Sequence, residues 1–195
     1  MSRKVVTEER RVDIIKGLYK CLTKKSFHET TIKDIAAETP CSYGIIHYHF
    51  KNKDGILLGL IDYLLDYHYG KYMEMVKGQS SELTSLEKID GMLGYIADNI
   101  TNNRELNTVF IKIVSIALGN DVIRKKIQEM YINWFRMLDS THFSGEDGAE
   151  SLHKSISLIA LHEGLSMFSV ILDRKYTRNF DIVAAFRKSI GTSQK

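Results

Sequence analysis

The sequence predicts an all-α protein of about nine helices. Apolar residues recur three and four positions apart along most of the 195 residues, which is the period of an amphipathic helix. No segment alternates apolar and polar residues over a convincing length, as an exposed strand would. Pro40 is the only proline, so no helix-breaking ring lies inside the other expected helices.

The first helix is expected from about Thr7 to Lys25, where Gly17 permits close packing. Its apolar face consists of Ile14, Ile15, Leu18 and Leu22. A second, short helix can be capped by Thr31, with Asp34 three residues later. This helix should stop near Thr39, because Pro40 has no amide proton and its ring pushes the preceding residue out of the helical region.

A third helix follows after only a short turn. Ser42 offers its N-cap, the helix is expected to run to about His49, and Ile45 and Ile46 are available for the core. Two helices joined by so short a turn must cross steeply. The crossing leaves an outer face in the position of a helix that enters the major groove of DNA. That face carries Tyr43, Gly44, His47 and Tyr48.

The remainder of the chain reads as six more helices separated by polar or glycine-containing breaks. A long helix is expected at Lys53 to Lys77, with glycine, glutamine and serine forming a loop at residues 78–81. The further helices are expected near Ser85 to Thr101, Arg104 to Leu118, Asp121 to Asp139, Gly148 to Leu172 and Asn179 to Ile190. The predicted division is a helix-turn-helix domain at residues 1–52 and a ligand-binding and dimerisation bundle at residues 53–195.

Residues of the N-terminal part match an ordered family pattern of paired apolar positions, an aromatic, Thr-Thr-Ile, Ile-Ala, Ser-x-Gly-x-Ile, a final Phe and Lys-x-Lys. The matching residues are Ile14, Ile15, Leu18, Leu22, Phe27, Thr30, Thr31, Ile32, Ile35, Ala36, Ser42, Gly44, Ile46, Phe50, Lys51 and Lys53. Over about the first 60 residues the chain therefore resembles the TetR family of bacterial transcriptional regulators, with a slight similarity to the BetI-type branch. The resemblance implies a regulator, most often a repressor, that binds DNA as a homodimer and responds to a ligand.

The sequence departs from the family pattern in two places. The turn between the two short helices usually reads Ala-Gly-Val, whereas Thr39, Pro40 and Cys41 stand here. His47 occupies the place of a tyrosine that commonly contacts phosphate in the family. Because histidine titrates near pH 6.5, DNA affinity is expected to depend on pH.

The expected DNA contacts lie in the basic N-terminal part. Through Gly55 there are eleven Lys and Arg against seven Asp and Glu, a net charge of +4, which leaves −1 for the remainder of a chain with a total of +3. Such charge favours phosphate binding. The predicted contacts to a double-stranded operator are Thr31, Lys33, Ser42, Tyr43, Gly44, His47, Tyr48, Lys51 and Lys53. Thr31, His47 and Lys53 are expected at phosphates, from their places in the resembling motif and their chemistry.

The last two long helices offer more apolar positions than one core needs, which favours a homodimer on a pseudo-palindromic operator. The expected interface residues are Ile156, Leu165, Phe168, Leu172, Val183 and Phe186. The alternative is packing within one chain.

Large, adaptable side chains in the central helices suit a mostly apolar effector pocket with few polar anchors. The candidate ligand residues are Tyr67, Tyr95, Phe110, Met130, Trp134, Met137, His162 and Met167. The alternative, favoured for most of these residues taken singly, is that they are simply core. His162 and Glu163 interrupt the otherwise apolar stretch from Ile156 to Ile171, so one of them is a candidate polar anchor. No arginine cluster marks an anionic ligand, so a largely apolar or cationic-amphipathic effector is expected.

An enzyme is not expected, and neither a catalytic residue, a metal site nor a cofactor is predicted. Glu150 and His153 have the spacing of two metal ligands on a helix, but di-iron bundles need two such motifs. Cys21 and Cys41 are expected as buried free thiols. Without an apolar run of membrane length or a leader, a cytoplasmic location and no membrane contact are expected. The alternatives are a non-regulatory helical dimer, which coats DNA or binds proteins, and a bundle metalloenzyme.

Overall fold

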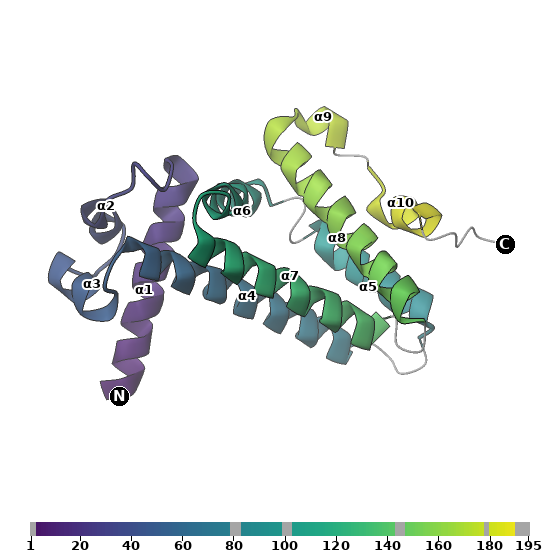
Figure 1. Ribbon diagram of the computed structural model, residues 1–195, viewed down its shortest axis with the longest axis horizontal. Helices are drawn as coiled ribbons and strands as arrows, with labels where there is room; N and C mark the ends of the chain where they lie inside the picture. The colour runs from purple at the N-terminus through teal and green to yellow at the C-terminus, as the bar shows by residue number, and fades with distance from the viewer. Residues whose placement is uncertain (1–2, 79–82, 99–102, 143–146, 178–179, 190–195) are drawn as a thin grey trace. The chain divides into compact units, whose positions relative to one another are not determined.

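A computed structural model describes residues 3–78, 83–98, 103–142, 147–177 and 180–189 (Figure 1). Helices are the only regular elements in these ranges, which confirms the predicted all-α class. The chain forms two compact units. The first comprises residues 1–69 and 109–127, and the second comprises residues 70–108 and 128–195. The predicted boundary at residues 52 and 53 falls inside the first unit.

The first unit begins with α1 (Arg3–Lys24), α2 (Ile32–Ala37) and α3 (Tyr43–His49), followed by the start of α4 (Lys53–Gly78). α2 packs against α1 and against α3, as Figure 1 shows. Their apolar faces meet in one core, in which the fully buried side chains are Ile14, Leu18, Leu22, Ile35, Ile46, Ile56, Leu57 and Leu60. Ile46 is buried as predicted. Ile45 is 38% exposed and does not lie in the core as expected, because adjacent residues of a helix point about 100° apart and Ile46 is the one that faces inward.

Gly17 brings α1 into close contact with α2. A Cβ atom added at Gly17 would lie 2.2 Å from Cγ2 of Thr39 and 3.1 Å from the backbone oxygen of Ile35. The two helices therefore approach more closely than any larger residue would allow. This confirms that Gly17 permits close packing.

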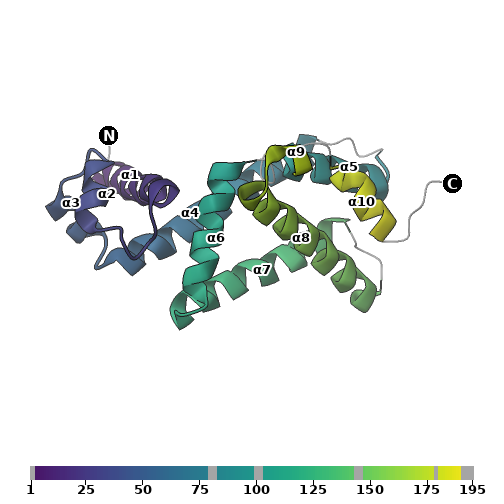
Figure 2. The same ribbon diagram turned by 90° about the horizontal axis from the view of Figure 1, so that it is seen from above.

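The second unit contains most of the remaining helices. They are α5 (Ser85–Ile96), α6 (Arg104–Ala117), α7 (Asp121–His142), α8 (Gly148–Ile171), α9 (Arg174–Thr177) and α10 (Ile182–Ser189), of which α6 and α7 continue into the first unit. Its core consists of Tyr72, Ile89, Met92, Leu93, Leu138, Leu158 and Ile159. α10 packs against both α5 and α8, as Figure 2 shows, and Arg187 of α10 forms a two-pronged ion pair with Asp90 of α5.

The nine predicted helices all have counterparts. α2 begins after Thr31, α3 after Ser42 and α4 at Lys53, as predicted. The break predicted at residues 173–178 instead contains the four-residue α9, which is too short to leave a periodic signal. α5 ends at Ile96, and the predicted extension to Thr101 runs beyond residue 98 into residues outside the described ranges.

α8 has an unusual distribution of polarity. Its buried residues are Ser151, Ser155, Leu158, Ile159, His162 and Ser166, so four of the six are polar. Its exposed residues include Leu152, Ile156, Met167, Phe168 and Ile171, with Ile171 at 68% exposure. Large exposed apolar groups gathered on one helix mark an interaction surface more often than an isolated one does.

Within the described ranges, no helix combines the length and the apolar character that crossing a membrane requires.

Candidate nucleic-acid interface

α3 presents its outer face because its two ends and its inner face are fixed. The Ser42 hydroxyl accepts a hydrogen bond from the Ile45 amide at 3.4 Å, which caps the helix, and Ile46 anchors the inner face with no exposed surface. On the outer face Tyr43 is 51% and Tyr48 is 80% exposed. Aromatic side chains this exposed on the seven-residue α3 contribute little to the core of the unit.

The Tyr43 and His47 rings contact each other along this face. They lie one helical turn apart, with ring centroids 4.5 Å apart in an edge-to-face arrangement. Both side chains are exposed, as are Ser42, Gly44 and Lys51. No atom from outside the local helix lies within 4 Å of the position where a Cβ of Gly44 would stand. Gly44 therefore leaves the backbone of the outer face open to a close approach.

The turn before α3 is formed without glycine. The Thr39 hydroxyl accepts a hydrogen bond from the Cys41 amide at 3.0 Å, and the Cys41 side chain is buried. Thr39 thus supplies the bend that the family usually obtains from glycine. The described Cys21 and Cys41 are both free, buried thiols.

An Arg side chain from α1 holds the end of α3. The Arg11 guanidinium donates to the backbone oxygen of His49 at 3.0 Å and lies 4.4 Å from the centre of the Phe50 ring. A cation at a helix C-terminus is favourable for the helix dipole as well. Sequence reasoning missed Arg11, because its partner lies 38 residues away and no local pattern marks the pair.

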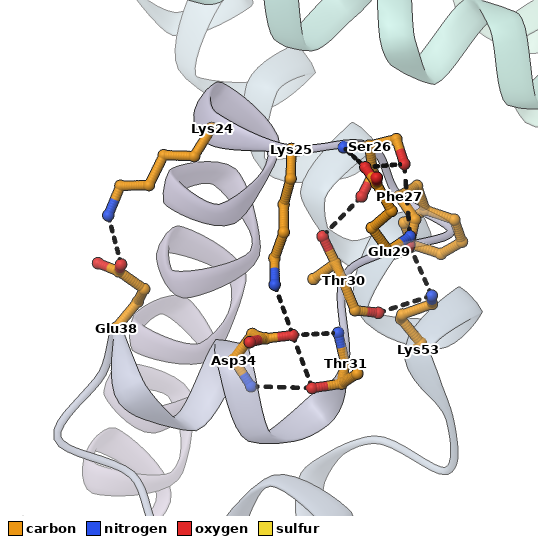
Figure 3. Close-up of polar contacts among 10 residues, drawn as sticks. All are labelled: Lys24, Lys25, Ser26, Phe27, Glu29, Thr30, Thr31, Asp34, Glu38 and Lys53. Atoms are coloured by element: carbon orange, nitrogen blue, oxygen red, sulfur yellow. Dashed lines mark hydrogen bonds and ion pairs between the residues drawn. The ribbon is translucent and has the colours of Figure 1, made fainter.

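α2 begins with a reciprocal cap (Figure 3). The Thr31 hydroxyl accepts from the Asp34 amide at 3.2 Å and donates to the Asp34 carboxylate at 2.7 Å, and the Thr31 amide donates to the same oxygen at 2.7 Å. Lys25 adds an ion pair with Asp34 at 2.7 Å. The cap agrees with the prediction from the sequence. The Thr31 hydroxyl, which is also a candidate phosphate contact, is engaged in the hydrogen bonds of this cap. Lys33, two residues after Thr31, is exposed.

These contacts make a pH-dependent stability at Asp34 an expected result. The Lys25 ammonium, followed by the Thr31 hydroxyl and amide, holds the pKa of the Asp34 carboxyl well below its ordinary value. A depressed folded-state pKa contributes stability that is present above the unfolded value, near 3.9, and is lost as the pH falls through the folded value. From pH 5 to pH 2, urea unfolding should show a smaller loss of stability for Asp34→Asn than for wild type. The same change at Asp66, exposed on α4, serves as the control, and equal losses in all three proteins would contradict the assignment.

Lys53 has a different environment from the other predicted phosphate contacts (Figure 3). Its ammonium donates to the backbone oxygens of Phe27 and Thr30 at 2.6 and 2.8 Å and lies 4.3 Å from the centre of the Phe27 ring. Partial burial lowers the pKa of the Lys53 ammonium. The loop between α1 and α2 is itself closely bonded, because Thr30 donates to the Ser26 carbonyl at 2.8 Å. This geometry favours Lys53 as a structural tie between α4 and the loop.

Comparison with known proteins bears on this unit directly. Residues 14–60 match the family description "Bacterial regulatory proteins, tetR family". The similarity to the tetR family is thus shown for this N-terminal segment of the chain. The match contains α2, α3, the turn between them and the first turns of α4, so it coincides with the helix-turn-helix described above.

Relatives of the tetR-family segment extend the similarity only in part. The chain is 36% identical over 75 residues to the uncharacterised HTH-type transcriptional regulator YerO of Bacillus subtilis (strain 168), an alignment of 38% of this chain and 25% of YerO. Solved structures share the whole fold: a transcriptional regulator of Rhodococcus sp. Rha1 (13% identity, 93% and 94% coverage of the two chains, TM-score 0.74) and a regulator of Saccharomonospora viridis in complex with choline (19%, 94% and 94%, TM-score 0.72).

Outside the tetR-family segment, the predicted ligand residues fall into both units. Tyr67, exposed, and Phe110, partly buried, belong to the first unit. In the second unit, Met130 and His162 are buried, Tyr95, Trp134 and Met137 are partly buried, and Met167 is 43% exposed. Trp134 and Met137 pack against the core cluster. The structure therefore brings only part of the predicted set together, and these positions remain predictions.

The pair of Glu163 and Tyr131 stands out in the second unit. The Tyr131 hydroxyl donates to the Glu163 carboxylate at 3.1 Å, and the Tyr131 and Trp134 rings lie edge to face with centroids 5.8 Å apart. Sequence analysis named Glu163 as a possible anchor, but a partner 32 residues away on α7 leaves no sequence signal. The neighbouring His162 ring nitrogen Nδ1 lies 3.5 Å from the Ser166 hydroxyl on the same helix.

The predicted dimer residues lie mainly on the outside of α8. Ile156, Phe168 and Leu172 are exposed by 44%, 45% and 37%, and Leu165 is partly buried. Val183 packs against the core cluster of its own unit, because α10 lies against α5 and α8. The side chain of Phe186 lies outside the described part of the structure.

Glu150 and His153, which have the spacing of two metal ligands on a helix, lie on the surface of α8. Glu150 forms an ion pair with Lys154 at 3.0 Å, and both Glu150 and His153 are exposed. The described residues contain no cluster of three or more His, Cys, Asp or Glu side chains that could hold a metal.

Proposed function

We propose that this protein is a transcriptional regulator that acts as a repressor. It binds a pseudo-palindromic operator as a homodimer, and a small-molecule effector releases it from the DNA. The outer face of α3 carries this proposal. It exposes Tyr43 and Tyr48 beside His47, while Ser42, Ile46 and Arg11 fix the helix from the other side. A short helix held in this way is suited to the major groove.

Two further observations support the homodimer and the effector. One reading helix contacts few base pairs, so pairing on a two-fold site is the usual source of affinity, and the exposed apolar face of α8 is suited to such pairing. The choline-bound regulator of Saccharomonospora viridis shows that a protein of this fold can hold a small molecule. The aromatic and methionine residues of the second unit support an effector site there.

In vitro selection from random duplex DNA tests the regulator. The full chain should enrich sequences with two inverted half-sites whose centres are one or more helical turns apart. Fluorescence anisotropy at fixed salt should then show tighter binding to the selected duplex than to a scrambled duplex of equal composition. Equal affinity for both would favour the second candidate, a dimer that coats DNA without sequence preference, for which the basic N-terminal part is the supporting observation.

Tyr43→Ala is expected to weaken binding to the selected duplex by about 1 kcal/mol, or roughly fivefold. One hydroxyl makes a single hydrogen bond to a base edge, which places the effect at the low end of the range for base contacts. Binding to scrambled duplex should change little. An equal loss on both duplexes would move Tyr43 to a phosphate, and unchanged binding on both would remove it from the interface. Ile132→Ala, also at an exposed apolar position but on α7, controls for general effects on the surface.

An effector in the second unit is expected to change the fluorescence of Trp134, the sole tryptophan. A compound at a hundredfold excess over its dissociation constant should raise the free energy of unfolding by about 2.7 kcal/mol and should lower operator affinity. A compound library is screened by thermal unfolding of the protein, which detects stabilising compounds. Trp134 emission and the fluorescence anisotropy of labelled operator are then measured with each of these compounds. Compounds that release the operator without affecting Trp134 emission would place the sensor elsewhere.

A further inference from the structure

Glu163 is a partly buried carboxylate without a positive partner in the described structure. Among the residues that the structure describes, its polar contact is the single hydrogen bond from the neutral Tyr131 hydroxyl. Charged groups taken out of water are normally paired, because their hydration is lost without compensation otherwise. Burial accordingly raises the pKa of Glu163 above its ordinary value. A carboxylate in this condition gains free energy when a cation is brought to it.

Tyr131, the hydrogen-bond partner of Glu163, belongs to a group of aromatic and polarizable side chains on α7. The Tyr131 ring, whose hydroxyl holds the carboxylate, has the Trp134 ring against its edge at 5.8 Å, and both pack against the core cluster together with Met137. Aromatic faces attract ammonium groups through their quadrupoles, most strongly when water is excluded, and tryptophan is the best of them. An ion such as sodium gains little from such rings, so the surroundings favour an organic cation.

The same helix turns polar groups inward. Ser155 is fully buried, and its hydroxyl has no hydrogen-bond partner in the described structure. It lies two helical turns before His162 on the buried face of α8, and Glu163 follows His162 directly. An orphaned buried hydroxyl costs free energy unless a partner is supplied. A hydroxyl or amide group would supply one if it belonged to a ligand that extends about 12 Å along α8 from Glu163.

We propose that Glu163, held by Tyr131 and accompanied by Trp134, is the counter-ion for an organic ammonium ligand that binds to the second unit. The inference rests on the proposed function, since it names the chemical class of the effector. It narrows the earlier expectation of a largely apolar or cationic-amphipathic molecule to one that carries a positive charge. Glu163 binds the ligand, whereas Tyr131 acts as a positioning residue for the carboxylate.

Isothermal titration and Trp134 emission on the full chain provide the test. The probes are choline and phenyltrimethylammonium, and 3,3-dimethylbutan-1-ol is a neutral probe that has the shape of choline. Both cations should bind saturably, and the neutral probe should bind about tenfold more weakly than choline or not at all. Equal affinity for choline and its neutral counterpart would overturn the proposal, and so would a wild-type protein that binds neither cation.

Variants assign the charge to its residue. Glu163→Gln keeps a hydrogen-bond acceptor for Tyr131 and removes the charge. It should lower the affinity for each of the two cations by about tenfold. Glu150→Gln is the matched control on the same helix, since Glu150 is exposed and paired with Lys154, and its cation affinity should equal that of wild type. Tyr131→Phe should lower the affinity for choline by a smaller factor, about threefold, and should leave the affinity for the neutral probe unchanged. Retention of full cation affinity by Glu163→Gln would overturn the assignment.

Two further measurements keep the test decisive. Thermal unfolding of Glu163→Gln checks that the variant folds, and if it does not, the wild-type comparison of choline with its neutral counterpart still decides. Anisotropy on the selected duplex runs in parallel. If the protein binds DNA specifically but binds neither cation, the proposed ligand class is overturned and the proposed regulator stands. If it binds the cations but not specific DNA, only the proposed regulator is overturned.

Discussion

Lys53→Met is expected to lower the free energy of unfolding by about 3 kcal/mol. Methionine retains the apolar part of the side chain but leaves the backbone oxygens of Phe27 and Thr30 without the ammonium that now binds both. Hydrogen bonds to a charged group contribute about 1.5 to 3 kcal/mol each, and the cation above the Phe27 ring adds to them. Urea denaturation followed by circular dichroism measures the loss.

Lys51→Met is the matched control, because Lys51 lies two residues away and is exposed. It should leave stability near wild type. The pair also tests the phosphate contact predicted for Lys53. If Lys53 binds phosphate, Lys53→Met lowers affinity for selected and scrambled duplexes alike and reduces the salt slope by about one. A changed slope together with unchanged stability would contradict the structural assignment.

Gly17→Ala is expected to destabilise the protein by about 2 kcal/mol. Alanine should gain about 1 kcal/mol in helix propensity, but the new methyl group collides with Cγ2 of Thr39 and crowds the Ile35 carbonyl. Overpacking of this kind costs about 1 to 3 kcal/mol. Rotation of Thr39 away from the new methyl group would break its hydrogen bond with the Cys41 amide, so the cost extends to the turn before α3.

Two further variants test this mechanism. Thr39→Ser removes the colliding methyl group and keeps the hydroxyl, so it should restore much of the stability lost in Gly17→Ala. Gly70→Ala is the control, since no atom from outside the local helix lies within 4 Å of its added Cβ, and it should be neutral or stabilising. If the double variant is no more stable than Gly17→Ala, the collision with Thr39 is not the cause.

The sequence predicted the elements of this fold well where the signal is local. Thr31 with Asp34, Ser42 and the proline at position 40 each define a helix end within three or four residues, and α2 and α3 begin where these residues predict. The four-residue α9 was missed, because one turn of helix is too short to show a period. Ile45 was assigned to the core because its side chain is apolar. Which face of α3 turns inward depends on tertiary packing, and Ile45 is exposed.

The candidate site was predictable only in part, because its decisive contacts join distant residues. The exposed aromatic face of α3 follows from the spacing of Tyr43, His47 and Tyr48. Nothing local indicates that Lys53 binds the carbonyls of residues 27 and 30, or that Arg11 binds that of His49. The Glu163 and Tyr131 pair depends in the same way on the packing of α8 against α7. A single sequence shows which groups can interact but not which of them meet.

The turn of Thr39, Pro40 and Cys41 affects the stability of the segment before α3 through the unfolded chain as well as through the folded one. Proline restricts the backbone of the unfolded ensemble, where glycine at a turn would leave it unusually free. Less conformational entropy is therefore lost when this turn forms than in a relative with glycine there. Part of the stability of the turn before α3 thus arises from conformations that Pro40 excludes from the unfolded chain, and no contact in the folded protein records this contribution.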